Sequence, residues 1–184
     1  MAELHGAEGS ARSRYPRGMN PLQAHLIALL HELAHGPEIT PASGAAYGHF
    51  SERGSGLLPT LRRLNAAQAS ASVHAAPARP MLAALVAHLS QLLTFASGQL
   101  NGAMDFPDFA APWQIGTVNA EDWTAMQTEL AQAFAAVRAS LEARELDSEE
   151  LNVAQTALTH AAYHAGAIRS QALNLLAVSG GSGA

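Results

Sequence analysis

The chain has 184 residues, of which 48% are hydrophobic and 5% aromatic, and its formal net charge is −5. This length and hydrophobic content predict one domain, and the abundance of alanine and leucine predicts an all-α fold. All ten basic residues are arginine, which excludes a P-loop lysine and Schiff-base catalysis, while the acidic balance argues against nucleic-acid binding. The absence of cysteine excludes disulfides and thiolate ligands, so any thiol chemistry must use a thiol from another molecule.

Targeting signals are missing from the sequence. The first residues lack the apolar segment of a signal peptide, and no window reaches the ~18 to 20 apolar residues of a membrane-spanning helix. We therefore expect a cytoplasmic protein that does not associate with a membrane. Residues 1–18, rich in glycine, serine and arginine, and residues 179–184 are predicted to be flexible.

The first helix is predicted over residues 21–35. Asn20 suits an N-cap, Pro21 suits the first helical position, and Gly36-Pro37 ends the leucine stripe. The following segment, 36–56, contains too many glycine, proline and serine residues for regular structure, which predicts a long first crossover.

Further helix signals follow along the chain. Residues 57–64 are expected to form a short helical turn, and Asn65 with Gln68 has the spacing of a capping box. Leucines at intervals of three and four predict a second long helix over about 82–100. Residues 101–113, with two prolines, are expected to form a loop.

Two more long helices complete the pattern. Asn119 is positioned to begin the third helix, and Asp147 the fourth, which carries acidic groups near the positive end of its dipole. Four amphipathic segments without a fixed internal repeat predict a four-helix bundle over residues 19–178, with the long first crossover.

Three histidines stand out as candidate metal ligands. His160 and His164 are four residues apart, and because a helix has about 3.6 residues per turn their rings lie on one face. Ala157 and Ile168 on the same face indicate that it points inward. A third ligand must come from elsewhere, and His88, within the apolar run of the second helix, is the best candidate. The alternative is a metal-free bundle whose histidines are hydrogen-bonded internally.

The other histidines are less suitable. His31 and His35 have the same spacing, but His35 directly precedes the helix end, where an imidazole complements the helix dipole. His25 is likewise interpreted as a weak candidate for a metal ligand. The remaining histidines lie in loop-like sequence and are interpreted as solvated or loop-bracing groups; they are His5, His49 and His74.

Three polar side chains of the last helix could influence the site. Tyr163 follows His160 by three residues and is expected to support a ligand by a hydrogen bond, or to donate a proton. Gln171 follows His164 by seven residues, two turns along nearly the same face, where it could reach a substrate. Arg169 is expected to point away from the metal.

The segment THAAYHAGAI resembles the last-helix signature of the DinB-like (YfiT-like) superfamily of four-helix-bundle metalloproteins, which includes bacillithiol and mycothiol S-transferases. Residues 20–177 share the resemblance through SGLLPTLRRLNAAQAS, LVAHLSQLLTF and TVNAEDWTAMQTELAQAFAAVRASL. The resemblance implies that His88, His160 and His164 hold a divalent metal, zinc or nickel, and that the protein is a homodimer. Where many members have Gly-Gln-Ile after the last histidine, this chain has Gly-Ala-Ile.

Three histidine ligands leave a coordination position open, as in catalytic sites. A bound water would have its pKa lowered toward ~7, and a bound thiol would be deprotonated. These alternatives predict either hydrolysis of a small molecule or transfer of a low-molecular-weight thiol, such as bacillithiol, to an electrophile. No carboxylate is placed beside the histidines by the sequence, so the general base is unidentified. The non-catalytic alternative is a metal-binding or dimerising helical stress protein.

Overall fold

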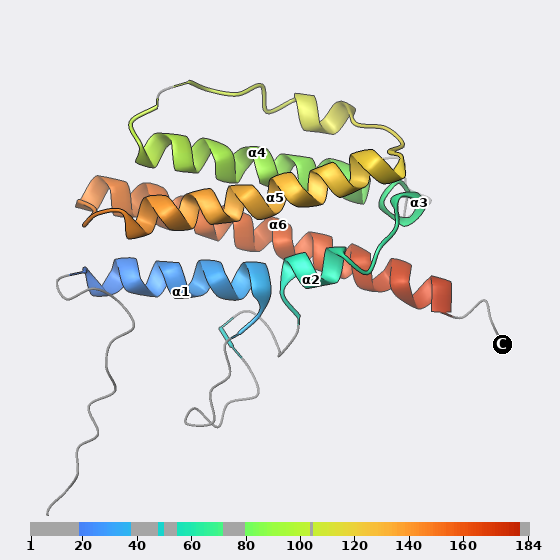
Figure 1. Ribbon diagram of the computed structural model, residues 1–184, viewed down its shortest axis with the longest axis horizontal. Coiled ribbons are helices and arrows are strands. Elements are labelled where there is room, and N and C mark those ends of the chain that lie inside the picture. Colours follow the sequence, from blue (N-terminus) through green and yellow to red (C-terminus); the bar gives the residue numbers. More distant parts are fainter. Residues whose placement is uncertain (1–18, 38–47, 50–54, 72–79, 104, 181–184) are drawn as a thin grey trace, which may run out of the picture.

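The computed structural model describes residues 19–37, 48–49, 55–71, 80–103 and 105–180. The predicted N-terminal arm, His5, His74 and the last four residues of the predicted C-terminal tail lie outside these ranges. The described elements, in chain order, are α1 (Pro21–His35), α2 (Leu57–Leu61), α3 (Ala66–Ala69), α4 (Leu82–Leu100), the 3-10 helix η1 (Ala111–Gln114), α5 (Ala120–Glu142) and α6 (Ser148–Gly180). The prediction of an all-α protein with four long helices is confirmed (Figure 1).

Side-chain caps explain where several helices begin. The Leu22 N–H donates to Asn20 Oδ1 at 2.9 Å, and Pro21 occupies the first turn of α1. Asn65 and Gln68 form the predicted capping box at the start of α3. Because such caps satisfy backbone donors that a helix leaves unpaired, they fix helix starts within a residue or two.

The four long helices pack around one leucine-rich core. Helix α4 lies against α5 and α6, and α1 packs against the other side of the same two helices (Figure 1). The fully buried apolar side chains come from all four helices and from α2; they include Ile27, Leu57, Leu61, Leu82, Leu89, Leu93, Leu130 and Ile168. Each such side chain contributes about 1.5–3 kcal/mol by leaving water, so burial of these faces dominates the stability of the bundle.

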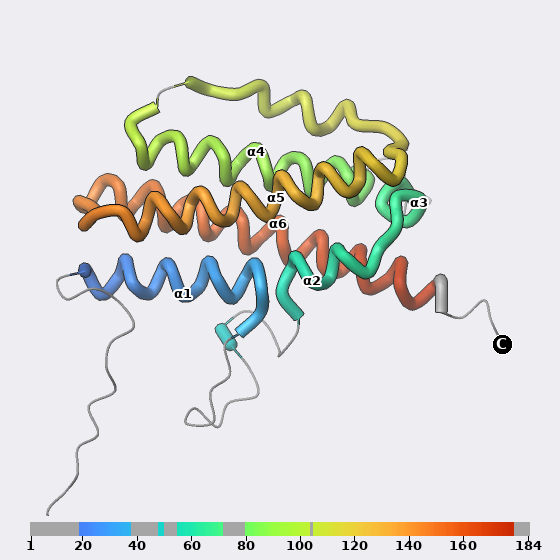
Figure 2. The backbone as a smooth tube through the Cα atoms, viewed as in Figure 1, coloured from blue at the N-terminus to red at the C-terminus, as the bar shows by residue number. Residues whose placement is uncertain are grey.

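The connection between α4 and α5 runs back along the bundle, so these two neighbouring helices point the same way (Figure 2). The sequence pattern predicted only a loop here. Part of the connection forms η1, which contacts α4, and Pro112 is buried there. The Gln91 amide nitrogen holds the segment to α4 by donating to the Asp108 carbonyl at 3.0 Å.

A buried amide ties α1 to the turn between α5 and α6. Gln23 is 0% exposed, and its Nε2 donates to the carbonyls of Leu141 and Arg144, the latter at 2.7 Å. The Leu146 N–H donates to Gln23 Oε1 at 3.1 Å. One side chain thereby pairs two carbonyls and one N–H of this turn, directly before Asp147 caps the first turn of α6 by accepting from the Glu149 and Glu150 N–H groups.

Two boundaries differ from the predictions. The predicted turn over 57–64 is the shorter α2, and α6 continues to Gly180, past the predicted start of the tail at residue 179.

In the part of the chain that the structure describes, no helix is long and apolar enough to cross a membrane.

Candidate metal centre

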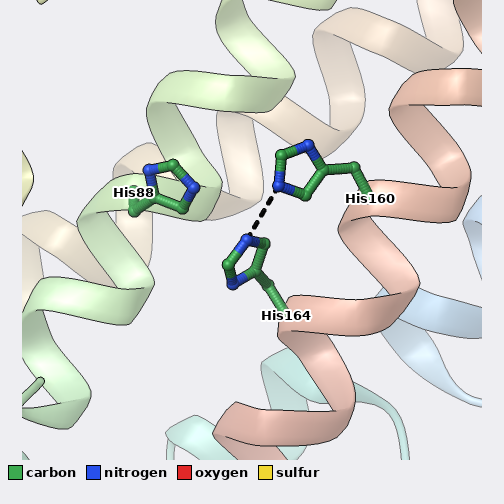
Figure 3. Close-up of side chains that lie close together, drawn as sticks. All are labelled: His88, His160 and His164. Carbon is green, nitrogen blue, oxygen red and sulfur yellow. Dashed lines mark hydrogen bonds between the residues drawn. The ribbon is translucent and has the colours of Figure 1, made fainter. Parts of the chain in front are cut away.

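The structure brings together the three histidines that the sequence singled out. His88 comes from the middle of α4, and His160 and His164 come from α6, with their rings directed into the space between the two helices (Figure 3). One nitrogen of each ring can be chosen so that all three lie within 4.8 Å of one another. The Nε2 atoms of His160 and His164 are 2.9 Å apart.

These distances are close to those that a metal ion requires. Zn–N bonds of ~2.0–2.1 Å in a tetrahedral site place two ligand nitrogens about 3.3 Å apart. To reach that spacing, the His160 and His164 nitrogens, now 2.9 Å apart, would separate slightly. The His88 nitrogen, which lies at most 4.8 Å from them, would move slightly closer. Both changes are small enough for side-chain rotation, so the three residues fit a divalent ion.

The cluster lies at the edge of the core and not at its centre. His88 is 7% exposed and His164 is 8% exposed, whereas His160 is an exposed residue. Two ligands are thus held inside the bundle and the third borders solvent. An ion bound here would be reachable from the side of His160, which is the arrangement of a site that admits another molecule.

The environment keeps the two buried rings neutral. Burial lowers the pKa of His164 to about 4, with further contributions from the neighbouring His88 and His160 rings. Burial, and then the charge of His160, also lowers the pKa of His88 from its ordinary value. A neutral imidazole has a free lone pair, so both side chains are in the protonation state that coordinates metal.

Aromatic rings pack against both buried ligands. The Nδ1 atoms of His88 and His164 are buried and have no hydrogen-bond partner. The Trp113 indole lies over His88 with ring centroids 4.5 Å apart and planes tilted by 33°. The Tyr163 ring meets His164 edge-on, with centroids 5.2 Å apart. Metal-bound histidines usually donate their second N–H to a carboxylate or carbonyl, and here ring contacts take that orienting role.

The residues flanking the site were only partly foreseen. Tyr163 is 73% exposed and contacts His164 through its ring, whereas the hydrogen bond or proton donation expected of its hydroxyl stays a prediction. Trp113 was not predicted, because it lies in the α4–α5 connection and no local pattern relates it to His88. A tryptophan next to Pro112, in a segment predicted to be a loop, was the only signal available.

Two other polar residues of α6 lie away from the cluster's open side. Gln171 is 8% exposed, so it is buried beside the core and not displayed to solvent. Arg169 is half-buried, and its Nε is enclosed without a hydrogen-bond partner, which differs from the surface position expected for it. Neither residue belongs to the histidine cluster.

The rival pair on α1 has the wrong electrostatics for a metal. The rings of His31 and His35 are 4.9 Å apart, but an Arg138 guanidinium nitrogen lies 3.5 Å from His31 Nδ1. Desolvation and the charges of Arg62 and Arg138 lower the pKa of His35. Two nearby guanidinium groups create a positive potential that opposes cation binding. His25 contacts His49 edge-on, with centroids 5.3 Å apart, and the described residues supply no third ligand there.

Comparisons of the chain with protein-family models, curated proteins and solved structures found no match. The resemblance to the DinB-like superfamily therefore stays a prediction. What stands is an all-helical protein with a cluster of three histidines that could hold a metal ion.

Proposed function

We propose that this protein binds a divalent transition metal through His88, His160 and His164 and transfers a low-molecular-weight thiol to a small electrophile. The observation that carries the proposal is the convergence of three imidazoles, two of them buried and neutral, on a point bordered by solvent. Three imidazole nitrogens suit zinc or nickel. When bound, such an ion acts as a Lewis acid that deprotonates a coordinated thiol or water.

The composition of the cluster favours a thiol over water as the nucleophile. Within the described residues the cluster contains histidines only, with no carboxylate to serve as general base. A thiol held at an ion bound by these three histidines would need no base from the protein and would release its proton to solvent. Its sulfur then forms a bond to the electrophilic carbon while the leaving group departs with its electron pair. The chain has no cysteine, so the sulfur must come from a separate molecule.

The chain's own residues would hold and orient the reactants. His88 and His164 anchor the centre inside the bundle, and His160 completes it at the solvent edge. Trp113, 44% exposed, and Tyr163 present aromatic surfaces on either side, against which an apolar electrophile can pack. Hydrolysis through bound water is the second reaction that the same centre could support.

A structural metal is the alternative that the geometry also favours. The three ligands come from α4 and α6, which pack directly on each other, so an ion would fasten these helices together without turnover. Such a protein would be stabilised by metal and catalyse nothing.

We further propose that the protein is a cytoplasmic homodimer. Light scattering on the purified full chain would test the dimeric state.

Two measurements test the proposed function in order. Elemental analysis of tag-free protein should find close to one divalent ion per chain in the wild type and almost none in His160→Ala. An unchanged metal content in that variant would refute the site. A conjugation assay with bacillithiol and monobromobimane should then show metal-dependent acceleration that His88→Ala abolishes. Equal rates in the two proteins would refute the transferase and, with metal present, leave the structural role.

A further inference from the structure

A cavity open to solvent lies between α4 and α5, bordered by the start of the connection between them. Its volume is about 540 Å³, which is within the ~300–1,000 Å³ of typical small-molecule sites. The lining comes from α4 between Ala87 and Gly98, from α5 between Glu129 and Ala136, and from Ala103, Asp105 and Pro107 of the connection. None of the three clustered histidines lines it, so this cavity is separate from the candidate metal centre.

The charged groups of the cavity are all acidic. Asp105 and Glu129 line it, and no lysine, arginine or histidine does. Among the described residues, neither carboxylate has an ion-pair partner. The amide oxygen of Gln91, another lining residue, is buried without a hydrogen-bond partner, while its nitrogen is already committed to the Asp108 carbonyl. Within the part of the chain that the structure describes, the lining therefore offers two carboxylates without ion-pair partners and an unused amide oxygen, which favours a ligand that donates hydrogen bonds and carries positive charge.

Apart from Ser90, Thr94 and Gln132, which are polar and uncharged, the rest of the lining is apolar and includes the aromatic ring of Phe95. Phe95 lines the cavity, and its ring contacts those of Phe106 and Phe109, with centroids 5.1 Å and 5.6 Å away. Small residues open the space beside it, namely Ala87, Gly98, Ala133 and Ala136. Aromatic faces attract cations, and apolar walls favour an organic body over a hydrated metal ion.

We propose that this cavity binds an organic amine in its protonated form. The apolar part of the amine packs against Phe95 and the alanines, and the ammonium group faces the acidic side chains Asp105 and Glu129. The proposal is independent of the metal centre and of the proposed reaction.

Titration calorimetry with phenylbutylamine tests the proposal on the full chain, with a chelator present so that the amine cannot coordinate metal. Phenylbutanol and phenylbutyrate have nearly the same body with a neutral and an anionic end. The amine should bind about tenfold more tightly than the alcohol, because an ammonium group gains both ion pairing and cation–π attraction, and the acid should not bind. Equal binding of amine and alcohol would overturn the cationic specificity.

Variants locate the binding. Ala136→Leu should fill the cavity and abolish amine binding, whereas Ala135→Leu, on the adjacent exposed position that does not line the cavity, should leave it unchanged. The double variant D105N/E129Q should bind the amine as weakly as the wild type binds the alcohol. His160→Ala should bind the amine normally. Amine binding that survives Ala136→Leu, in protein with wild-type circular dichroism, would refute this cavity as the site.

Discussion

The indole of Trp113 covers the imidazole of His88, with 4.5 Å between the two ring centroids, although the two residues belong to different elements. Because the Nδ1 of His88 has no hydrogen-bond partner, the orientation of this ring is restrained by packing, and Trp113 contacts it as closely as the other ligand His164 does, at 4.6 Å. Trp113 belongs to the α4–α5 connection, so this connection contributes a side chain to the candidate metal centre although it is not one of the four long helices.

Trp113→Ala should weaken metal binding without unfolding the protein. Loss of an outer-shell partner of a metal-bound histidine costs ~10–100-fold in affinity, and we expect about tenfold here because packing orients a ring less strictly than a hydrogen bond does. Competition with a chromophoric chelator measures the Kd. Trp113→Phe, which keeps a ring over His88, should retain most of the affinity. Equal affinities for wild type and Trp113→Ala would show that the indole has no orienting role.

Metal removal should lower the melting temperature. An ion that binds only the folded state at 100 times its Kd adds about 2.7 kcal/mol, which for a chain of this size corresponds to roughly 5–10 °C. Differential scanning calorimetry with and without an excess of chelator gives the shift. His160→Ala serves as the control, since its melting temperature should not respond to the chelator. A chelator effect of the same size in both proteins would place the metal elsewhere.

The metal-free protein should lose stability as the solution is acidified. The pKa of His164 is about 4 in the folded protein and ~6.5 in an unfolded chain, so between these values the unfolded state binds more protons. The stabilisation is complete above pH ~6.5 and declines as the pH falls toward about 4, by an amount of order 3 kcal/mol. Urea unfolding in chelator across this range tests the slope. His164→Gln should flatten it, and an equally steep slope in that variant would assign the effect to other groups.

Gln23→Leu should be strongly destabilising although leucine suits a buried position by size and polarity. The substitution leaves the Leu141 carbonyl and the Leu146 N–H buried without partners, at ~1–3 kcal/mol for each group, and also removes a partner of the part-buried Arg144 carbonyl, so we expect a loss of about 3–6 kcal/mol. Urea denaturation measures the free energy of unfolding. Gln155→Leu, at an exposed position of α6, should change it little. A loss below 1 kcal/mol in Gln23→Leu would mean that the turn finds other partners.

Local signals in the sequence were sufficient for the helices. The bounds of α1 agree with the prediction because Asn20, Pro21 and Gly36 act on the backbone within one or two residues of themselves. The convergence of His160 and His164 follows from helical spacing alone. The position of His88 opposite them depended on the apolar stripe of α4 packing inward, which the structure has.

Long-range contacts could not be predicted in the same way. Gln23 occurs in a leucine-rich helix, and nothing near it in the chain indicates that the turn at 142–148 needs its amide. The stacking of Trp113 on His88 depends on the path of a connection whose prolines predict a loop but no direction. Both features arise from tertiary packing, where a residue's partners are distant in sequence.

The hydrogen bonds of Gln23 to the α5–α6 turn make the length of that turn important for the candidate metal centre. Because Gln23 holds the Leu146 N–H and Asp147 caps the first turn of α6, the direction in which His160 and His164 point is set about three turns upstream of them. One extra residue inserted between Glu142 and Ser148 would have to bulge out, or else rotate the helix by about 100° and swing both imidazoles away from α4. Relatives of this chain that keep the histidines but vary in this turn would then have lost the capacity to coordinate an ion.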